Sequence, residues 1–120
     1  MIQKLQPAKG KVISFLVSGK LRDEDYQVFV PEVEALIERE GKVRLLLQFE
    51  NFHGWDLHAA WDDMVFGIKH QGDIERLAMA GDEPKAARLA RLAKPFIAGE
   101  VMFFPSDELP AAWDWLLEGL

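Results

Sequence analysis

Two hydrophobic patterns meet in the middle of the chain. Residues 43–49 read VRLLLQF, a nearly continuous apolar run that is typical of a strand buried on both faces. A turn is predicted at His53 and Gly54. Beyond this turn, apolar side chains recur at the three- and four-residue spacing of a helix with one buried face; they are Leu57, Trp61, Met64, Val65 and Ile68. We therefore expect a strand, a turn and a helix over residues 43–70.

The same reasoning predicts four more strands and three more helices. The strands are expected over residues 2–6, 12–17, 75–80 and 100–104, with residues 18–20 ending the second. One helix is expected to begin near Asp23 and to end before Gly41, with a kink or restart at Pro31. Its predicted buried stripe consists of Tyr26, Phe29, Val30, Val33, Leu36 and Ile37. Two further helices are expected after Asp82 and Ser106, which are predicted to cap them.

This order of elements predicts an α/β fold. The first two strands are close enough in sequence to form an antiparallel pair. Strands two to five are each separated by a helix, so they need crossover connections and are expected to be parallel. With 120 residues, the chain fits a single domain spanning 1–120. We expect a five-stranded mixed sheet, mostly parallel, with about four helices.

Composition excludes several classes of function. The formal net charge of −6 disfavours nucleic acid as a partner, because the chain offers no net countercharge to phosphate. The absence of cysteine excludes disulfides, thiolate catalysis and cysteine-ligated metals. No stretch approaches the ~20 apolar residues that span a bilayer, so no integral membrane segment is expected, and the amino end has no apolar signal core. A cytoplasmic location is the expectation that follows.

A set of motifs resembles one protein family. They are the GWD of residues 54–56, Trp61 with Asp63, Phe66-Gly67, His70, Asp73, Glu75-Arg76, Ala78, Gly81-Asp82, Pro95-Phe96, Glu100-Val101 and Phe103-Phe104. Together they resemble the SpoIIAA-like bacterial proteins of the STAS superfamily, and residues 52–82 are the most specific part. The resemblance implies a small mixed sheet with helices packed on it, a fold shared with the lipid-binding CRAL-TRIO domain.

The chain departs from the anti-anti-sigma factors of that superfamily in one respect. Those proteins carry a phosphorylatable Ser or Thr in the loop after the third strand. Here residues 51–61 contain neither, and the chain has no Thr at all. A phosphate switch needs a hydroxyl at a helix start, where it adds about −1.5 to −2 charge. Phosphorylation-dependent partner switching is therefore not expected.

Four residues near the predicted turn include types that bind metals. They are His53, Asp56, His58 and Asp62. His58 and Asp62 are four residues apart and share a helix face, but metal sites usually need three or four convergent ligands. A helix cap by Asp56 and solvated histidines is the favoured interpretation, so no metal and no cofactor are predicted.

No catalytic residues are predicted. The chain has no nucleophile elbow, no phosphate-binding loop and no dinucleotide fingerprint. Glu50 and Asp56 are the carboxylates best placed for acid–base work, but the sequence gives no warrant for that role in either. His70 is expected to have a structural role at a helix end, where a protonated imidazole meets the negative end of the helix dipole; the alternative is pairing with Asp73 or Glu75. A non-enzymatic protein is therefore the favoured interpretation.

Aromatic residues around the predicted turn are the strongest candidates for a binding site. Tryptophan is enriched where proteins bind one another. The candidate site consists of Phe52, Trp55, Asp56, Leu57, His58, Trp61 and Met64. The favoured hypothesis is a protein-interaction or regulatory domain that binds a protein partner or forms a homodimer. The alternative is a carrier of a small apolar, lipid-like ligand, held in a cavity beneath the helix containing Pro31 and the helix containing Met64.

Overall fold

The computed structural model describes residues 1–70, 72–82 and 84–120, and all their side chains except those of Leu57, Met64, Ile68, Lys85 and Phe96. The strands are β1 (Ile2–Lys4), β2 (Val12–Leu21), β3 (Val43–Trp55), β4 (Ile74–Gly81) and β5 (Glu100–Pro105). The helices are α1 (Asp23–Glu40), α2 (Leu57–Lys69), α3 (Lys85–Ala93) and α4 (Leu109–Leu117), with a 3₁₀ turn η1 (Lys94–Phe96). The predicted α/β fold with five strands and four helices is confirmed.

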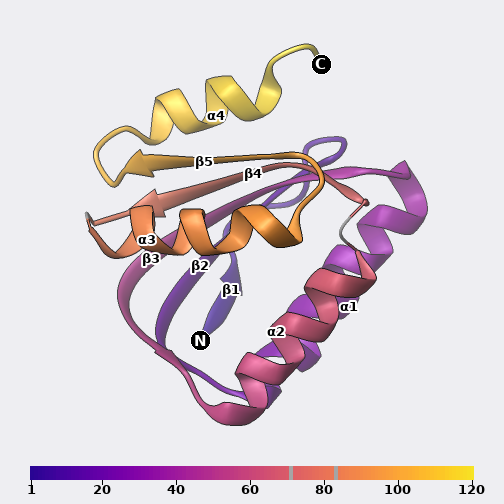
Figure 1. The fold of residues 1–120 in the computed structure, drawn as a ribbon. Helices are drawn as coiled ribbons and strands as arrows, with labels where there is room; N and C mark the ends of the chain where they lie inside the picture. Colours follow the sequence, from indigo (N-terminus) through magenta and orange to yellow (C-terminus); the bar gives the residue numbers. More distant parts are fainter. Residues whose placement is uncertain (71, 83) are drawn as a thin grey trace.

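The strands lie side by side in the order in which they occur in the chain. β1 pairs with β2 in antiparallel fashion, and β2 to β5 are parallel to one another. Parallel crossovers are almost always right-handed, so successive crossovers in one direction leave their helices on the same face of the sheet. Figure 1 shows this arrangement, with α1, α2 and α3 on one face and α4 on the other.

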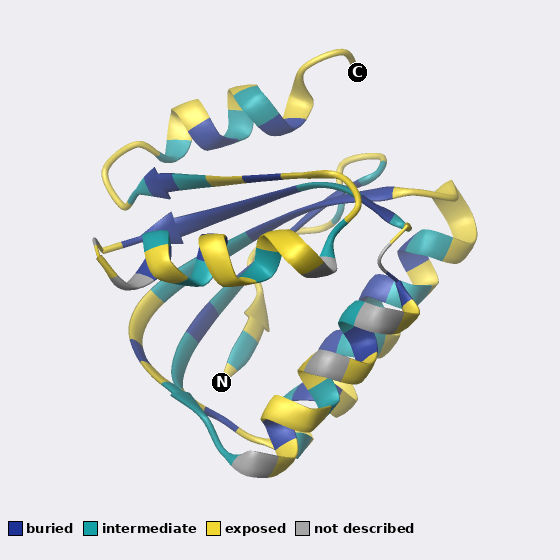
Figure 2. Cartoon of the chain, in the orientation of Figure 1, coloured by how far each residue is buried: buried dark blue, intermediate teal, exposed yellow. Residues whose placement is uncertain are grey.

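Each face of the sheet has its own hydrophobic core. The larger core lies between the sheet and α1 to α3, and it includes Phe15, Phe29, Val33 and Leu45. The smaller core lies under α4 and consists of Val12, Leu46, Ala78, Ala80, Phe104, Ala112 and Leu116. Residues 43–46 of β3 and 77–81 of β4 are buried (Figure 2), as expected for strands that are covered on both faces.

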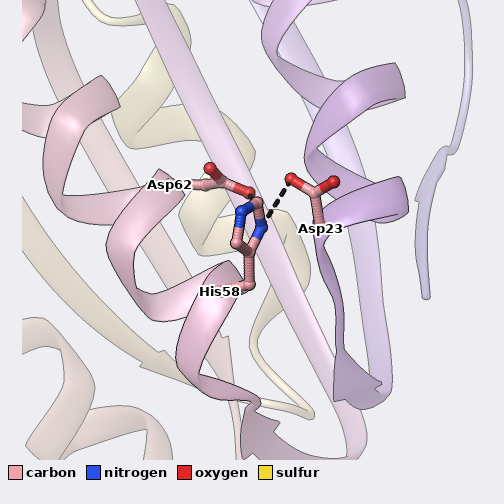
Figure 3. A group of neighbouring side chains, drawn as sticks. All are labelled: Asp23, His58 and Asp62. Atoms are coloured by element: carbon pink, nitrogen blue, oxygen red, sulfur yellow. Dashed lines mark ion pairs between the residues drawn. The ribbon is translucent and has the colours of Figure 1, made fainter.

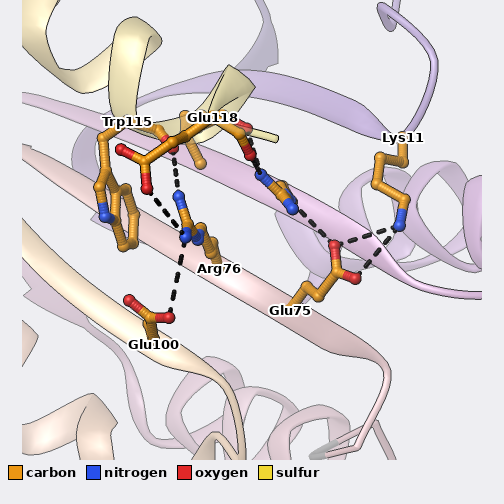
Figure 4. A network of polar contacts seen from close by, with 8 residues as sticks. Lys11, Glu75, Arg76, Glu100, Trp115 and Glu118 are labelled. Atoms are coloured by element: carbon orange, nitrogen blue, oxygen red, sulfur yellow. Dashed lines mark hydrogen bonds and ion pairs between the residues drawn. The ribbon is translucent and has the colours of Figure 1, made fainter. Parts of the chain in front are cut away.

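Two arginines hold the end of α4 against the sheet. Arg44 of β3 donates hydrogen bonds to Glu75 Oε2 at 2.8 Å and to the Glu118 carbonyl at 2.8 Å. Arg76 of β4 donates to the Trp115 carbonyl at 2.6 Å, and its guanidinium lies over the Trp115 ring (Figure 4). These bonds add donors to carbonyl groups at the end of α4, where the last turn of a helix lacks its usual partners.

Strands β2 and β3 are longer than predicted. Residues 18–20 do not end β2, and the predicted turn at His53 and Gly54 is wrong, because β3 runs on to Trp55. The two strands stay paired across shifts in register, with Gly19 opposite Phe52. Gly19 and Gly54 have φ values of 62° and 102°. Glycine adopts such angles readily, so both residues fit paired strands at the place where Asn51 and His53 of β3 bulge out of the register.

The predicted helix caps also need correction. Asp23 is the first residue of α1, and Arg22 precedes it as the cap. Asp82 and Ser106 do not cap α3 and α4, which begin after Pro84 and Glu108. The Ser106 hydroxyl instead lies 3.4 Å from Asp82 Oδ1. Residues 106–108 turn the chain from the end of β5 to the opposite face, so α4 starts later than the sequence pattern indicates.

The buried face of α2 differs from the predicted one. Trp61 and Val65 are 60% and 46% exposed, whereas Ala59 and Phe66 are buried. The predicted stripe also included Leu57, Met64 and Ile68, whose side chains lie outside the described part of the chain. The side of α2 that faces the sheet carries the acidic residue Asp63, which was not part of the predicted stripe. The first helix was predicted correctly in this respect, since Tyr26, Phe29, Val33 and Leu36 are buried.

Pro31 lies inside α1, which continues through it without a restart. Across the described residues, no helix has both the length and the apolar composition needed to cross a lipid bilayer.

Candidate functional site

A cavity of about 330 Å³ lies between the sheet and the three helices that cover its larger core. Strands β1 to β4 and helices α1, α2 and α3 all contribute side chains to its wall. Most of these side chains are apolar, among them Val17, Phe29, Leu45, Leu47, Phe66 and Met79. Ligand pockets typically have volumes of about 300–1,000 Å³ and mostly apolar walls. The cavity is therefore large enough for a small organic molecule.

The cavity exists because α1 and α2 form a pair that stands apart from α3. Ion pairs join α1 to α2 near both ends, with Asp23 to His58 at one end and Glu34 to His70 at the other. Phe29 and Phe66 are in contact between them, with ring centroids 5.5 Å apart. The wall residues that face the cavity from the helices include small ones, namely Ala60, Gly67 and Ala93. Small residues at these positions leave the space above the sheet unfilled.

One side of the cavity carries a chain of polar groups. Trp55 at the end of β3 donates its indole Nε1–H to the hydroxyl oxygen of Tyr26 at 2.8 Å. Tyr26 on α1 donates its own hydroxyl hydrogen to Asp63 Oδ1 on α2 at 2.9 Å. All three side chains line the cavity. The three elements that surround this side of the cavity are therefore linked through its polar wall.

The apolar surroundings change the acidity of this chain. Asp63 has substantial accessible surface, yet it lines the cavity and protein atoms surround it. Burial raises the pKa of the Asp63 carboxyl above its usual range, and the hydrogen bond from Tyr26 lowers it in part. Burial and the neighbouring Asp63 charge raise the pKa of Tyr26, so this residue stays a neutral donor.

The structure separates the residues that the sequence grouped into one site. Phe52 is 8% exposed and contacts Phe49 and Trp55 edge to face. Asp56 caps α2, as predicted, by accepting a hydrogen bond from the Ala59 N–H at 2.8 Å. His58 and Trp61 point outward and are exposed, and the side chains of Leu57 and Met64 lie outside the described residues. Of the predicted residues whose side chains are described, Trp55 is the one that lines the cavity.

The sequence analysis missed Tyr26 and Asp63 as site residues. Tyr26 was assigned to the buried stripe of α1, where its hydroxyl group needs a partner. Asp63 lies four residues after Ala59 and three before Phe66, both of which are buried. This helical spacing was the available signal, because an acidic residue on a buried face needs a hydrogen-bond partner or a function.

A second cluster of polar side chains lies at the start of α1 and α2 (Figure 3). His58 Nδ1 lies 2.9 Å from Asp23 Oδ1 and 3.5 Å from Asp62 Oδ2. A hydrogen bond between the two carboxyl groups raises the pKa of Asp62 and lowers that of Asp23. One atom from each side chain lies within 4.8 Å of the others, so these three residues are the ones that a divalent ion would use. Of the four residues weighed in the sequence as metal ligands, His58 and Asp62 belong to this cluster and His53 and Asp56 do not.

The remaining histidine has a structural role. His70 at the end of α2 lies 2.9 Å from Asp73 Oδ2 and 2.7 Å from Glu34 Oε2. The pairing with Asp73, which the sequence left open as an alternative, is observed. Hydrogen bonds from Lys69 and His70 lower the pKa of Glu34. Glu75, the other predicted partner, instead binds Arg44 and Lys11.

Comparison with known proteins identifies the family and supports the fold. The model of the family described as SpoIIAA-like matches residues 12–117. A crystal structure of an uncharacterized protein from the DUF3478 family with a SpoIIAA-like fold, from Shewanella loihica PV-4, is 32% identical in sequence. The match covers 97% of this chain and 92% of that chain, with a TM-score of 0.78. No curated protein matches this chain. The resemblance noted in the sequence is confirmed, and this chain belongs to the SpoIIAA-like family.

Proposed function

We propose that this protein binds a small apolar ligand in the cavity between the α1–α2 pair, α3 and the sheet. The observation that carries the proposal is the cavity itself, with its volume of about 330 Å³ and its mostly apolar wall. Voids larger than a water molecule are few in folded cores, because unfilled space forfeits contacts, so a space of this volume supports binding of a ligand. The proposal concerns binding without a chemical reaction.

The structure gives less support to an interface built on Phe52 and Trp55. Phe52 is buried, and the indole N–H of Trp55 is bonded to Tyr26. Both residues therefore contribute to the fold or to the cavity. A different pair, Trp61 and Val65 on the outer face of α2, is exposed. This pair supports protein binding or homodimer formation as a second candidate function, since exposed tryptophan is typical of interfaces.

Native mass spectrometry of gently purified protein tests the first proposal. We expect added mass that leaves when the protein is denatured, or that appears when decylamine is supplied. The Ala60→Phe variant places a phenyl ring in the cavity wall and should lose the added mass. Ala111→Phe makes the same change on the exposed side of α4 and should keep it.

Two results would overturn the ligand proposal or favour the second candidate. If neither purified nor supplied ligand binds the unaltered protein, or if both variants bind equally well, the cavity is not a binding site. A dimer mass that disappears in the Trp61→Gln variant would instead support an interface on the outer face of α2.

A further inference from the structure

Asp63 is unusual among the residues that line the cavity. Of the lining residues that the structure describes, it is the one with a carboxyl group, and none is basic. Its Oδ1 accepts the hydrogen bond from Tyr26. Its Oδ2 makes no hydrogen bond with any residue in the described part of the chain. A carboxylate has about four acceptor positions, so Asp63 has acceptor capacity left over on the side of the cavity.

The polar chain fixes the position of this carboxylate. Trp55 donates to Tyr26 and Tyr26 donates to Asp63, so the two donors come from β3 and α1 while the acceptor is on α2. Both donors are fixed in direction, because the Trp55 indole is a donor only and the raised pKa of Tyr26 keeps its hydroxyl protonated. The hydrogen bonds therefore hold the Asp63 carboxylate in the cavity wall, and its second oxygen keeps acceptor capacity for a ligand.

A carboxylate in an apolar wall favours some ligands over others. It attracts a group that donates hydrogen bonds, most strongly one with a positive charge, since charge-assisted hydrogen bonds are about twice as strong as neutral ones. It repels another carboxylate, and no cation in the described part of the wall is present to offset that repulsion. The wall thus disfavours fatty acids, the most familiar single-chain lipids.

We infer that the ligand is an apolar chain or ring system ending in a hydrogen-bond-donating head group, a primary amine foremost and an alcohol next, which donates to Asp63 Oδ2. This inference rests on the proposed binding function and adds the chemical class of the ligand. The contacts that select the head group are those of Asp63, and the rest of the ligand lies among the apolar side chains of the cavity.

Competitive binding with three ligands of equal chain length tests this inference. Decylamine, decan-1-ol and decanoate are each titrated into the full chain, and displacement of an uncharged fluorescent probe is measured at pH 7. We expect decylamine to bind at least tenfold more tightly than decanoate, with decan-1-ol between them. In the Asp63→Asn variant, the preference for the amine should fall about tenfold. Asp114→Asn removes the same charge from the exposed face of α4 and should leave the preference unchanged.

The outcomes separate the inference from the proposed function. If decanoate binds as tightly as decylamine, or if Asp63→Asn and Asp114→Asn behave alike, the assignment of the head group is wrong while ligand binding stands. If none of the three ligands displaces the probe, ligand binding itself fails. The comparison among ligands in the unaltered protein needs no variant, so it decides the question even if Asp63→Asn does not fold.

Discussion

The volume of the cavity predicts how affinity depends on the length of a bound alkyl chain. Each non-hydrogen atom of a small ligand occupies roughly 25–30 Å³, judging from benzene in an engineered cavity of about 150 Å³ and from the volume of a water molecule. A cavity of about 330 Å³ therefore holds about 11 to 13 such atoms. Burial of each CH₂ group contributes about 0.8 kcal/mol, which changes Kd about fourfold.

Isothermal titration calorimetry with n-alkylamines of increasing length measures this dependence directly. The amines are kept below the concentrations at which they form micelles. We expect Kd to fall about fourfold for each added CH₂ group and then to level off near a total of about 12 non-hydrogen atoms. For a chain of that length, burial contributes about 10 kcal/mol and lost freedom of motion costs at least about 4 kcal/mol. The remaining 6 kcal/mol or so corresponds to a Kd of tens of micromolar.

The chain length at which Kd stops falling, called the break below, is the test. If Kd continues to fall at the same rate well beyond 12 atoms, the chain is not confined by the cavity and the reasoning from its volume is wrong. A series with no dependence on length would refute it equally. In the Ala60→Phe variant the break should move to shorter chains, whereas Ala111→Phe should leave it in place.

Two further predictions concern the fold that holds the cavity. A Cβ atom added at Gly99 would lie 2.2 Å from the Glu75 carbonyl oxygen, so Gly99→Ala should lower the melting temperature by several degrees, about 1–3 kcal/mol. Gly72→Ala meets nothing within 4 Å and should have little effect; equal effects would contradict this reasoning. Hydrogen bonds from Arg44 and Lys11 lower the pKa of Glu75 below its ordinary value of 4.5. The stability that Glu75 contributes is therefore present above about pH 4.5 and is lost as pH falls through its lower folded pKa. Thermal melts between about pH 6 and pH 3 should show a smaller loss of stability in Glu75→Gln than in the unaltered protein, and an unchanged slope would contradict the ion pair.

Hydrophobic periodicity predicted the elements of this fold well, because most of them bury one clear face. It failed where the backbone bends within a strand. Gly19 and Gly54 allow both bulges and turns, and the choice between them depends on whether the neighbouring strand bends at the same place. β2 and β3 do bend together, and this pairing between distant segments cannot be deduced from either segment alone.

The site was harder to predict than the fold. Trp55 was recognised from its residue type, but Tyr26 and Asp63 acquire their roles only when α1 packs against α2 and both face β3. The same packing brings Asp23 to His58, across a separation of 35 positions in the chain that no local spacing rule covers. The clue that a sequence does offer is an acidic residue on the buried face of a predicted helix. Asp63 is such a residue.

The order of the strands has a consequence for how the protein is made. Each parallel strand pairs with the one before it in sequence, so the sheet can grow one unit at a time as the chain leaves the ribosome. Helix α4 comes last, and it covers the face formed by Val12, Leu46, Ala78 and Phe104. Until α4 docks, that row of apolar side chains is open to other nascent chains. Docking of helix α4 covers this row, and exposed apolar patches of that kind favour aggregation.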